Sequence, residues 1–206
     1  MEKLLKLIAV VSAIGVVICA AYVLYAKLSP QYAQDQLAIV DTQNTQPAGS
    51  ESGATEHDEH DGHDHEHENL AADFTVFDAE GNEVHLSDYF GKPIVLNFWA
   101  SWCGPCKQEM PDFNEKYLEY GDRVQFLMVN MTDGDRETVQ TASDFIAQMG
   151  YTFPVLFDTD YNAAIAYSAN SLPMTVLIDS SGKMVAYAVG AIDAATLQQG
   201  IDIILE

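Results

Sequence analysis

The sequence predicts an α/β domain in which a mixed β-sheet is covered by helices on both faces. Two apolar runs, at residues 94–99 (apart from Asn97) and 124–131, are typical of strands buried on both faces. Each run is followed by a segment with the pattern of a helix. A hairpin and a last helix then complete the chain, and this order of elements requires both parallel and antiparallel strands in one sheet.

Turn and cap residues set the boundaries of the individual elements. Gly121 and Gly150 are expected to end helices, and Asp193 is expected to cap the last one. In chain order we expect hairpin strands at 74–78 and 83–86, a strand at 94–99, a helix from Cys103 to Gly121, a strand at 124–131, a helix at 135–149, a short strand at 153–157, a short helix at 160–167, hairpin strands at 174–178 and 184–189, and a helix from 193 to about 205.

The charge of the chain argues against a nucleic acid partner. The 206 residues carry a net charge of −22. Residues 29–68 hold ten acidic residues and no lysine or arginine, and residues 69–206 hold twenty acidic residues and six basic ones. Phosphate backbones repel such a surface, whereas protein substrates with basic residues are compatible with it.

Residues 1–28 predict a single transmembrane anchor. Residues 7–26 contain no charged side chain, and twenty residues of helix span the hydrocarbon core of a bilayer. Two lysines precede the run and one follows it, which favours a cytoplasmic N-terminus and an extracytoplasmic catalytic domain at the cell membrane. A cleaved signal peptide with its site near Cys19 is the alternative.

Residues 29–69 predict a flexible, acidic, histidine-rich linker, because their composition cannot bury enough apolar surface to fold. Imidazole and carboxylate groups together suit zinc, nickel or copper, so a weak metal site is one interpretation of this tract. A solvated acidic spacer is the other, and we favour it. The candidate ligands are His57, His60, His63, His65 and His67.

Cys103 and Cys106 form the only cysteine pair outside the N-terminal run, and they lie at a predicted strand-to-helix junction. At the helix N-terminus the free N–H groups and the dipole favour the thiolate of Cys103. Cys106, one turn further on, is placed to resolve a mixed disulfide. A zinc site is the alternative, but it needs two further ligands, and His85 is the only histidine in the domain.

Residues 97–107, read as Asn-Phe-Trp-Ala-Ser-Trp-Cys-Gly-Pro-Cys-Lys, resemble a thioredoxin active site. The Glu-Met-Pro sequence at 109–111, the Gly-Lys-Pro sequence at 91–93 and the hairpin before it are more similar to the TlpA/ResA group, with its redoxin or AhpC/TSA-like domain. The resemblance runs from about Phe74 to the C-terminus. It implies a thioredoxin fold over residues 70–206, with an N-terminal β-hairpin and a helix–strand insertion in mid-domain.

The resemblance also implies roles for individual residues. Glu109 is expected to handle protons beside the catalytic Cys103 and Cys106. Asn97 departs from thioredoxins, which have a buried aspartate at this position, and an amide cannot exchange protons. Proton exchange with the cysteines must therefore be carried out by Glu109 or by water. Pro173 is expected to follow a cis peptide bond that presents the Leu172 backbone to substrate. The residues expected to contact substrate are Trp102, Gly104, Pro105, Leu172 and Pro173.

These observations predict an enzyme that reduces extracytoplasmic protein disulfides, with electrons from a membrane donor of the thioredoxin-reducing type. The resemblance further implies a link to cytochrome c maturation. We expect no cofactor beyond the Cys103–Cys106 disulfide. Gly104-Pro105 argues against a disulfide-forming oxidase. Ala100 argues against a thiol peroxidase, which commonly has threonine three residues before its cysteine. A metal-binding protein that uses the histidine tract is the non-enzymatic alternative.

Overall fold

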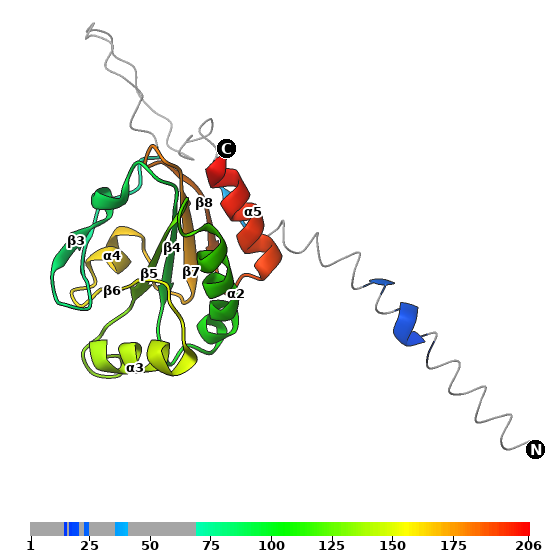
Figure 1. Cartoon of the computed structure of the whole chain (residues 1–206), viewed down its shortest axis with the longest axis horizontal. Coiled ribbons are helices and arrows are strands. Elements are labelled where there is room, and N and C mark those ends of the chain that lie inside the picture. The colour runs from blue at the N-terminus through cyan, green and yellow to red at the C-terminus, as the bar shows by residue number, and fades with distance from the viewer. Residues whose placement is uncertain (1–14, 16, 21–22, 25–35, 41–68) are drawn as a thin grey trace, which may run out of the picture.

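The computed structural model, shown in Figure 1, describes residues 15, 17–20, 23–24, 36–40 and 69–206. In this part of the chain eight strands form one sheet in the order β1-β8-β7-β4-β5-β6-β2-β3. The strands are β1 (Ala38–Ile39), β2 (Thr75–Phe77), β3 (Glu83–His85), β4 (Ile94–Trp99), β5 (Gln125–Asn130), β6 (Val155–Phe157), β7 (Met174–Ile178) and β8 (Met184–Val189). The helices are the 3₁₀-helix η2 (Leu86–Tyr89), α2 (Gly104–Tyr120), α3 (Val139–Met149), α4 (Asn162–Ala166) and α5 (Ala194–Leu205).

The central strand β4 is buried along its whole length. It pairs in parallel with β5 and antiparallel with β7, so both of its edges are hydrogen-bonded. Its side chains alternate between the two faces: Leu96 and Phe98 enter one hydrophobic cluster, and Val95 and Trp99 enter the other. The predicted mixed sheet with two covered faces is therefore confirmed.

Helices α2, α3 and α5 contribute side chains to the cluster of Val95 and Trp99. Helix α4 and η2 contribute to the cluster on the opposite face. Figure 1 shows α2 beside α5 on one side of the sheet and α4 on the other. Since β4 leads directly into the α2 layer, the residues between them lie at the carboxyl edge of the parallel strands, where α/β proteins commonly place their sites.

The predicted cap of the last helix is confirmed, whereas the predicted start of α3 is wrong. The Asp193 side chain accepts a hydrogen bond from the Thr196 backbone N–H at 2.8 Å, as an N-cap does. Helix α3 begins at Val139 rather than at Asp135. The Asp133 carboxylate accepts hydrogen bonds from the backbone of residues 135 and 137, and this tight turn delays the helix.

Part of the predicted spacer is built into the sheet. Strand β1 pairs antiparallel with β8, and the Val40 N–H donates to the Val185 carbonyl at 2.9 Å. Leu37 is only 6% exposed and belongs to the cluster that contains the apolar face of α5. The Met184 N–H donates to the Asn69 carbonyl at 2.9 Å, so the chain returns to β8 next to the residue where it left. The interpretation of 29–69 as an unstructured spacer is therefore wrong for residues 36–40.

Two sequence predictions concern residues that lie largely or wholly outside the described ranges. The anchor at 1–28 is described only at residues 15, 17–20 and 23–24. Within the described ranges, no helix is both long enough and apolar enough to cross a bilayer. The histidine tract at 57–67 is not described, and the described residues contain no cluster of metal-ligating side chains.

The burial of Leu37 predicts that β1 contributes to stability. Leu37→Ala should lower the free energy of unfolding by about 2 kcal/mol, because it removes buried methyl groups and leaves a cavity. Ile39→Ala, two residues further on in β1 but 55% exposed, should cost less than about 0.5 kcal/mol. Equilibrium urea unfolding followed by tryptophan fluorescence measures both changes. Equal effects of the two substitutions would contradict the docking of Leu37 in the core.

Candidate active site

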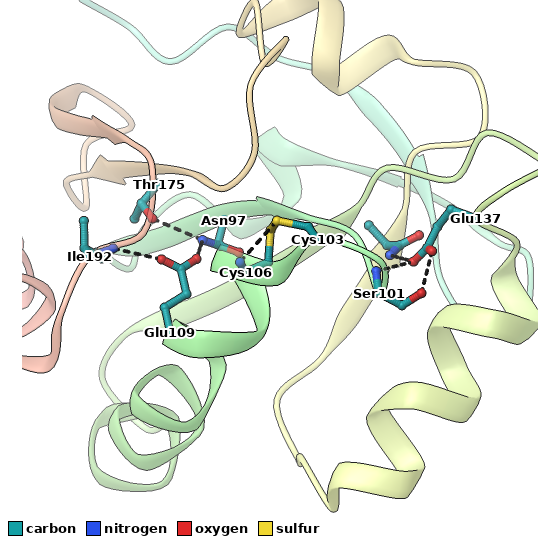
Figure 2. Close-up of a disulfide and its surroundings, with 9 residues drawn as sticks. Asn97, Ser101, Cys103, Cys106, Glu109, Glu137, Thr175 and Ile192 are labelled. Atoms are coloured by element: carbon teal, nitrogen blue, oxygen red, sulfur yellow. Dashed lines mark hydrogen bonds between the residues drawn. A yellow bond between two sulfur atoms is a disulfide. The ribbon is translucent and has the colours of Figure 1, made fainter.

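The two cysteines lie where β4 leads into α2. Cys103 is the N-cap residue of α2, and its Sγ accepts a hydrogen bond from the Cys106 backbone N–H at 3.2 Å. A disulfide joins the two residues, whose Cα atoms are 5.3 Å apart (Figure 2). The first turn of a helix carries free N–H groups and the positive end of its dipole, so this position stabilises a thiolate on Cys103 when the disulfide opens.

A cavity of about 390 Å³ opens beside Cys103. Cys103 lines it, whereas Cys106 does not and is fully buried. An incoming group therefore meets the sulfur of Cys103 first. The other lining residues are Trp102, Gly104, Pro105, Met131, Asp133, Tyr161, Ala169, Asn170 and Leu172.

The predicted substrate-contacting residues gather at this cavity with one exception. Trp102, Gly104, Pro105 and Leu172 line it, while Pro173, the residue after Leu172, does not. The Leu172–Pro173 peptide bond is cis, as the resemblance implied. A second cavity, of about 610 Å³, shares several lining residues with the first and extends over α4. Together they form a largely apolar surface next to Cys103.

Glu109 is buried behind the disulfide, three residues after Cys106 and so on the same side of α2. It is 2% exposed. One carboxylate oxygen accepts a hydrogen bond from Asn97 Nδ2 at 2.9 Å, and the other accepts one from the Ile192 N–H at 3.0 Å (Figure 2). Burial raises the pKa of Glu109 to about 7, although both hydrogen bonds act to lower it. This carboxyl group can therefore gain or lose a proton near neutral pH.

Asn97 connects Glu109 to the neighbouring strand. Its Nδ2 also donates to Thr175 Oγ1 at 3.1 Å, while its Oδ1 is buried without a hydrogen-bond partner. Sequence reasoning noted Asn97 as the polar residue in an apolar strand but missed Thr175 and Ile192. Both lie far along the chain from Asn97, and no local pattern marks them as partners of Glu109.

A second buried carboxylate, Glu137, was not predicted at all. It is fully buried, and it accepts hydrogen bonds from the Ser101 N–H at 2.7 Å, from Ser101 Oγ at 2.6 Å and from Asn130 Nδ2 at 2.7 Å. Next to it, the Arg136 guanidinium lies 4.0 Å from the centre of the Trp102 ring. Glu137 stands in a polar, charged stretch, so its sequence context indicates an exposed residue. Figure 2 shows it on the opposite side of the disulfide from Glu109.

The described residues offer no metal site near the cysteines. They contain no group of three potential metal ligands. The Nδ1 atom of His85 lies 3.2 Å from Thr75 Oγ1. The chemistry available at the junction of β4 and α2 is therefore that of two sulfur atoms, a helix N-terminus and a carboxyl group with a raised pKa.

Comparison with known proteins agrees with this geometry. The AhpC/TSA family matches residues 68–187. The thiol-disulfide oxidoreductase ResA of Geobacillus thermodenitrificans is 38% identical over 133 residues, which are 64% of this chain and 74% of that protein. ResA of Bacillus subtilis is 33% identical over 135 residues, 65% of this chain and 73% of that protein.

Solved structures show the same fold. A protein of Chlorobium tepidum described as a thiol:disulfide interchange protein DsbE is 34% identical, with a TM-score of 0.60 over 67% of this chain and 96% of that one. StoA of Bacillus subtilis is 28% identical, with a TM-score of 0.56 over 65% of this chain and 98% of that one. The chain therefore belongs to the AhpC/TSA family, and it is a thioredoxin-fold thiol–disulfide oxidoreductase related to ResA.

Proposed function

We propose that this enzyme reduces disulfides of proteins outside the cytoplasm, with Cys103 as the attacking thiol, Cys106 as the resolving thiol and Glu109 as the group that exchanges a proton with Cys106. The observation that carries the proposal is the asymmetry of the cysteine pair. Cys103 lines an open cavity at a helix N-terminus, whereas Cys106 is buried on the side of Glu109.

In the first step the Cys103 thiolate attacks one sulfur of a substrate disulfide. A mixed disulfide forms between Cys103 and that sulfur, and the other substrate sulfur leaves as a thiolate and takes a proton. The free N–H groups at the start of α2 stabilise the attacking thiolate. The cavity beside Cys103 gives the substrate access to this sulfur alone.

In the second step Cys106 attacks the Cys103 sulfur, releases the second substrate thiolate and closes the Cys103–Cys106 disulfide. The buried Cys106 thiol must first lose its proton, and Glu109 lies on the same side of α2 with a pKa near 7. We assign Glu109 as the acceptor of that proton, which it passes on to the departing thiolate. The substrate has then gained two electrons and two protons.

The surface around Cys103 favours an extended segment of a substrate protein. Two adjoining, largely apolar cavities pass Trp102, Tyr161 and Leu172, which suits a chain with exposed apolar side chains. Asp133 at the cavity and the strong negative charge of the domain favour basic residues near the target cysteine. Apocytochrome c before haem attachment is the substrate we propose on the basis of the resemblance to the TlpA/ResA group.

Re-reduction of the Cys103–Cys106 disulfide needs an electron donor. We propose a membrane thiol carrier, because residues 7–26 have the length and composition of a bilayer-spanning helix. A cytoplasmic N-terminus places the catalytic domain on the outer side of the same membrane.

The direction of the reaction is tested by the reduction potential of the Cys103–Cys106 pair. Equilibration with dithiothreitol or glutathione, read by tryptophan fluorescence, should give a value near or below about −270 mV, as for thioredoxin. Cys106→Ser, which cannot form the disulfide, is the control for the fluorescence change. A value near −120 mV would show a disulfide-forming oxidase instead.

The raised pKa of Glu109 predicts a defined dependence of stability on pH. The ordinary glutamate pKa is 4.5 and that of Glu109 is about 7. Between these values the folded protein holds a proton that the unfolded chain has lost, so the contribution of Glu109 to stability falls as pH rises through this range. The full effect is roughly 3 kcal/mol.

Glu109→Gln keeps the side chain neutral and removes this dependence. The unfolding free energy of Glu109→Gln, relative to the unsubstituted chain, should therefore increase between pH 4.5 and 7.5. Glu83→Gln, an exposed substitution on β3, is the matched control, in which this pH-dependent difference should be absent. Urea unfolding at several pH values measures the difference. A flat difference for Glu109→Gln would mean that Glu109 keeps the ordinary pKa of a glutamate, so that its carboxylate is too weak a base at neutral pH for the proposed transfer from Cys106.

The proposed location is tested with alkaline phosphatase, which becomes active only where its disulfides form, outside the cytoplasm. A fusion of this enzyme to the C-terminus of the full chain should be active in bacterial cells. The same fusion without residues 1–28 should be inactive. If both fusions were equally inactive, the proposed orientation would be wrong.

A further inference from the structure

Glu137 is a buried carboxylate for which the reaction described above has no use. It has no exposed surface, and the only ion pair among the described residues joins Lys116 to Glu119. Burial of a carboxylate without a cationic partner costs several kcal/mol unless hydrogen bonds satisfy its oxygens. Three hydrogen bonds do so here: the N–H and the hydroxyl of Ser101 donate two of them, and the side-chain amide of Asn130 donates the third. The position of Glu137 is thus tightly coupled to that of Ser101.

Ser101 belongs to the short loop that carries Cys103. The Cys103 N–H donates to the Ala100 carbonyl at 3.1 Å, so residues 100–103 form a turn between β4 and α2. Glu137 holds this turn by both the backbone and the side chain of Ser101. The other end of the contact, Asn130, is the last residue of β5 and pairs with Trp99 at the end of β4. The carboxylate therefore ties the loop to the carboxyl ends of two central strands.

The orientation of each partner is fixed by further contacts. Asn130 Oδ1 accepts a hydrogen bond from Thr132 Oγ1 at 2.8 Å, which leaves Nδ2 to face Glu137. The Asp133 carboxylate accepts hydrogen bonds from the N–H groups of Asp135 and Glu137, both at 2.8 Å. The Gly134 N–H donates to the Glu137 carbonyl, in a turn where Gly134 has a φ of +77° that suits glycine. These hydrogen bonds within residues 133–137 fix the backbone from which the Glu137 side chain extends.

The same turn contacts the loop at a second point. The Arg136 guanidinium lies 4.0 Å from the centre of the ring of Trp102, the residue between Ser101 and Cys103. Asp133, which begins the turn, lines the cavity with Cys103. Charged groups near the loop are therefore Arg136 and Asp133 from this turn, Glu137 itself, and Lys107, which follows Cys106 in α2.

We propose that Glu137 is a positioning residue for thiol–disulfide exchange, which fixes the Ser101 backbone and thereby holds Cys103 at the N-terminus of α2. In the oxidised enzyme the bond to Cys106 also holds Cys103 in place. When that bond opens, non-covalent contacts hold the loop, and the two hydrogen bonds from Ser101 to Glu137 fix it two residues before Cys103. The inference rests on the assignment of Cys103 as the attacking thiol.

The test is the alkylation rate of Cys103 in the reduced, full-length protein. Limiting iodoacetamide at pH 7, with peptide mass spectrometry to separate Cys103 from Cys19 and Cys106, gives the rate at each site. Glu137→Ala removes all three hydrogen bonds and should slow alkylation of Cys103 at least tenfold. Glu137→Gln keeps one acceptor oxygen for Ser101 N and Asn130 Nδ2 and can donate to Ser101 Oγ. It should restore the rate to within about threefold.

Asp158→Ala is the matched control. Asp158 is also a fully buried carboxylate, but its hydrogen bonds go to the N–H groups of Ala163 and Ala164 in α4. Both alanine variants should lower Tm, and only Glu137→Ala should slow alkylation of Cys103. Equal rates for the two alanine variants, or a faster rate in Glu137→Ala, would show a purely structural or purely electrostatic role and overturn the proposal.

If Glu137→Ala does not fold, Glu137→Asp replaces it. This variant keeps the charge but shortens the side chain, so it should react more slowly than Glu137→Gln. The reverse order would overturn the positioning role in favour of charge. Failure of the catalytic assignment gives a different result: alkylation of Cys106 before Cys103 in the unsubstituted protein would overturn both.

Discussion

The catalytic chemistry depends on the position of β4 at the centre of the sheet. Both edges of this strand are hydrogen-bonded and both of its faces are buried, so its carboxyl end has one place in the molecule. The next residues must turn into α2, and the first helical N–H groups meet Cys103 there. A thiolate in this position is stabilised by the helix terminus itself. The fixed position of β4 in the sheet therefore determines where the Cys103 sulfur lies relative to the helix N-terminus, and so how strongly its thiolate is stabilised.

Two buried carboxyl groups flank the disulfide, and their surroundings give them different properties. Glu109 accepts two hydrogen bonds, and burial outweighs them, so its pKa rises to about 7. Glu137 accepts three, two of them from a single residue of the active-site loop. The first arrangement suits a group that exchanges protons, and the second suits one that keeps its neighbours in place. One residue type therefore suits two purposes on the two sides of the same disulfide.

Local sequence signals were sufficient for most of the fold and for the sulfur chemistry. The buried run of β4, the Cys-x-x-Cys spacing and the Asp193 cap depend on residues close together in the chain, and all three are found where they were expected. The cis bond before Pro173 came from the resemblance to known proteins, because no physical pattern in one sequence distinguishes it from other X–Pro bonds.

The features that sequence reasoning missed depend on contacts between distant residues. Glu137 contacts Ser101 across the insertion, and its acidic surroundings gave no sign of burial. Strand β1 has only two residues, too few to show a period, and the burial of Leu37 before it depends on α5 at the other end of the chain. The start of α3 was misplaced because the side chain of Asp133 competes locally for the same N–H groups.

The pairing of β1 with β8 also determines how far the catalytic centre can reach. Val40 and Asn69 are hydrogen-bonded to adjacent residues of β8. The number of residues between them therefore does not affect the distance between the N-terminal run and the domain. Only residues 29–35 span that gap, and the eight Cα–Cα steps from residue 28 to residue 36 cover at most about 29 Å. With the run anchored as proposed, the enzyme works close to the bilayer surface. Lengthening the chain within 41–68 leaves this distance unchanged, whereas lengthening it within 29–35 extends the working radius of Cys103.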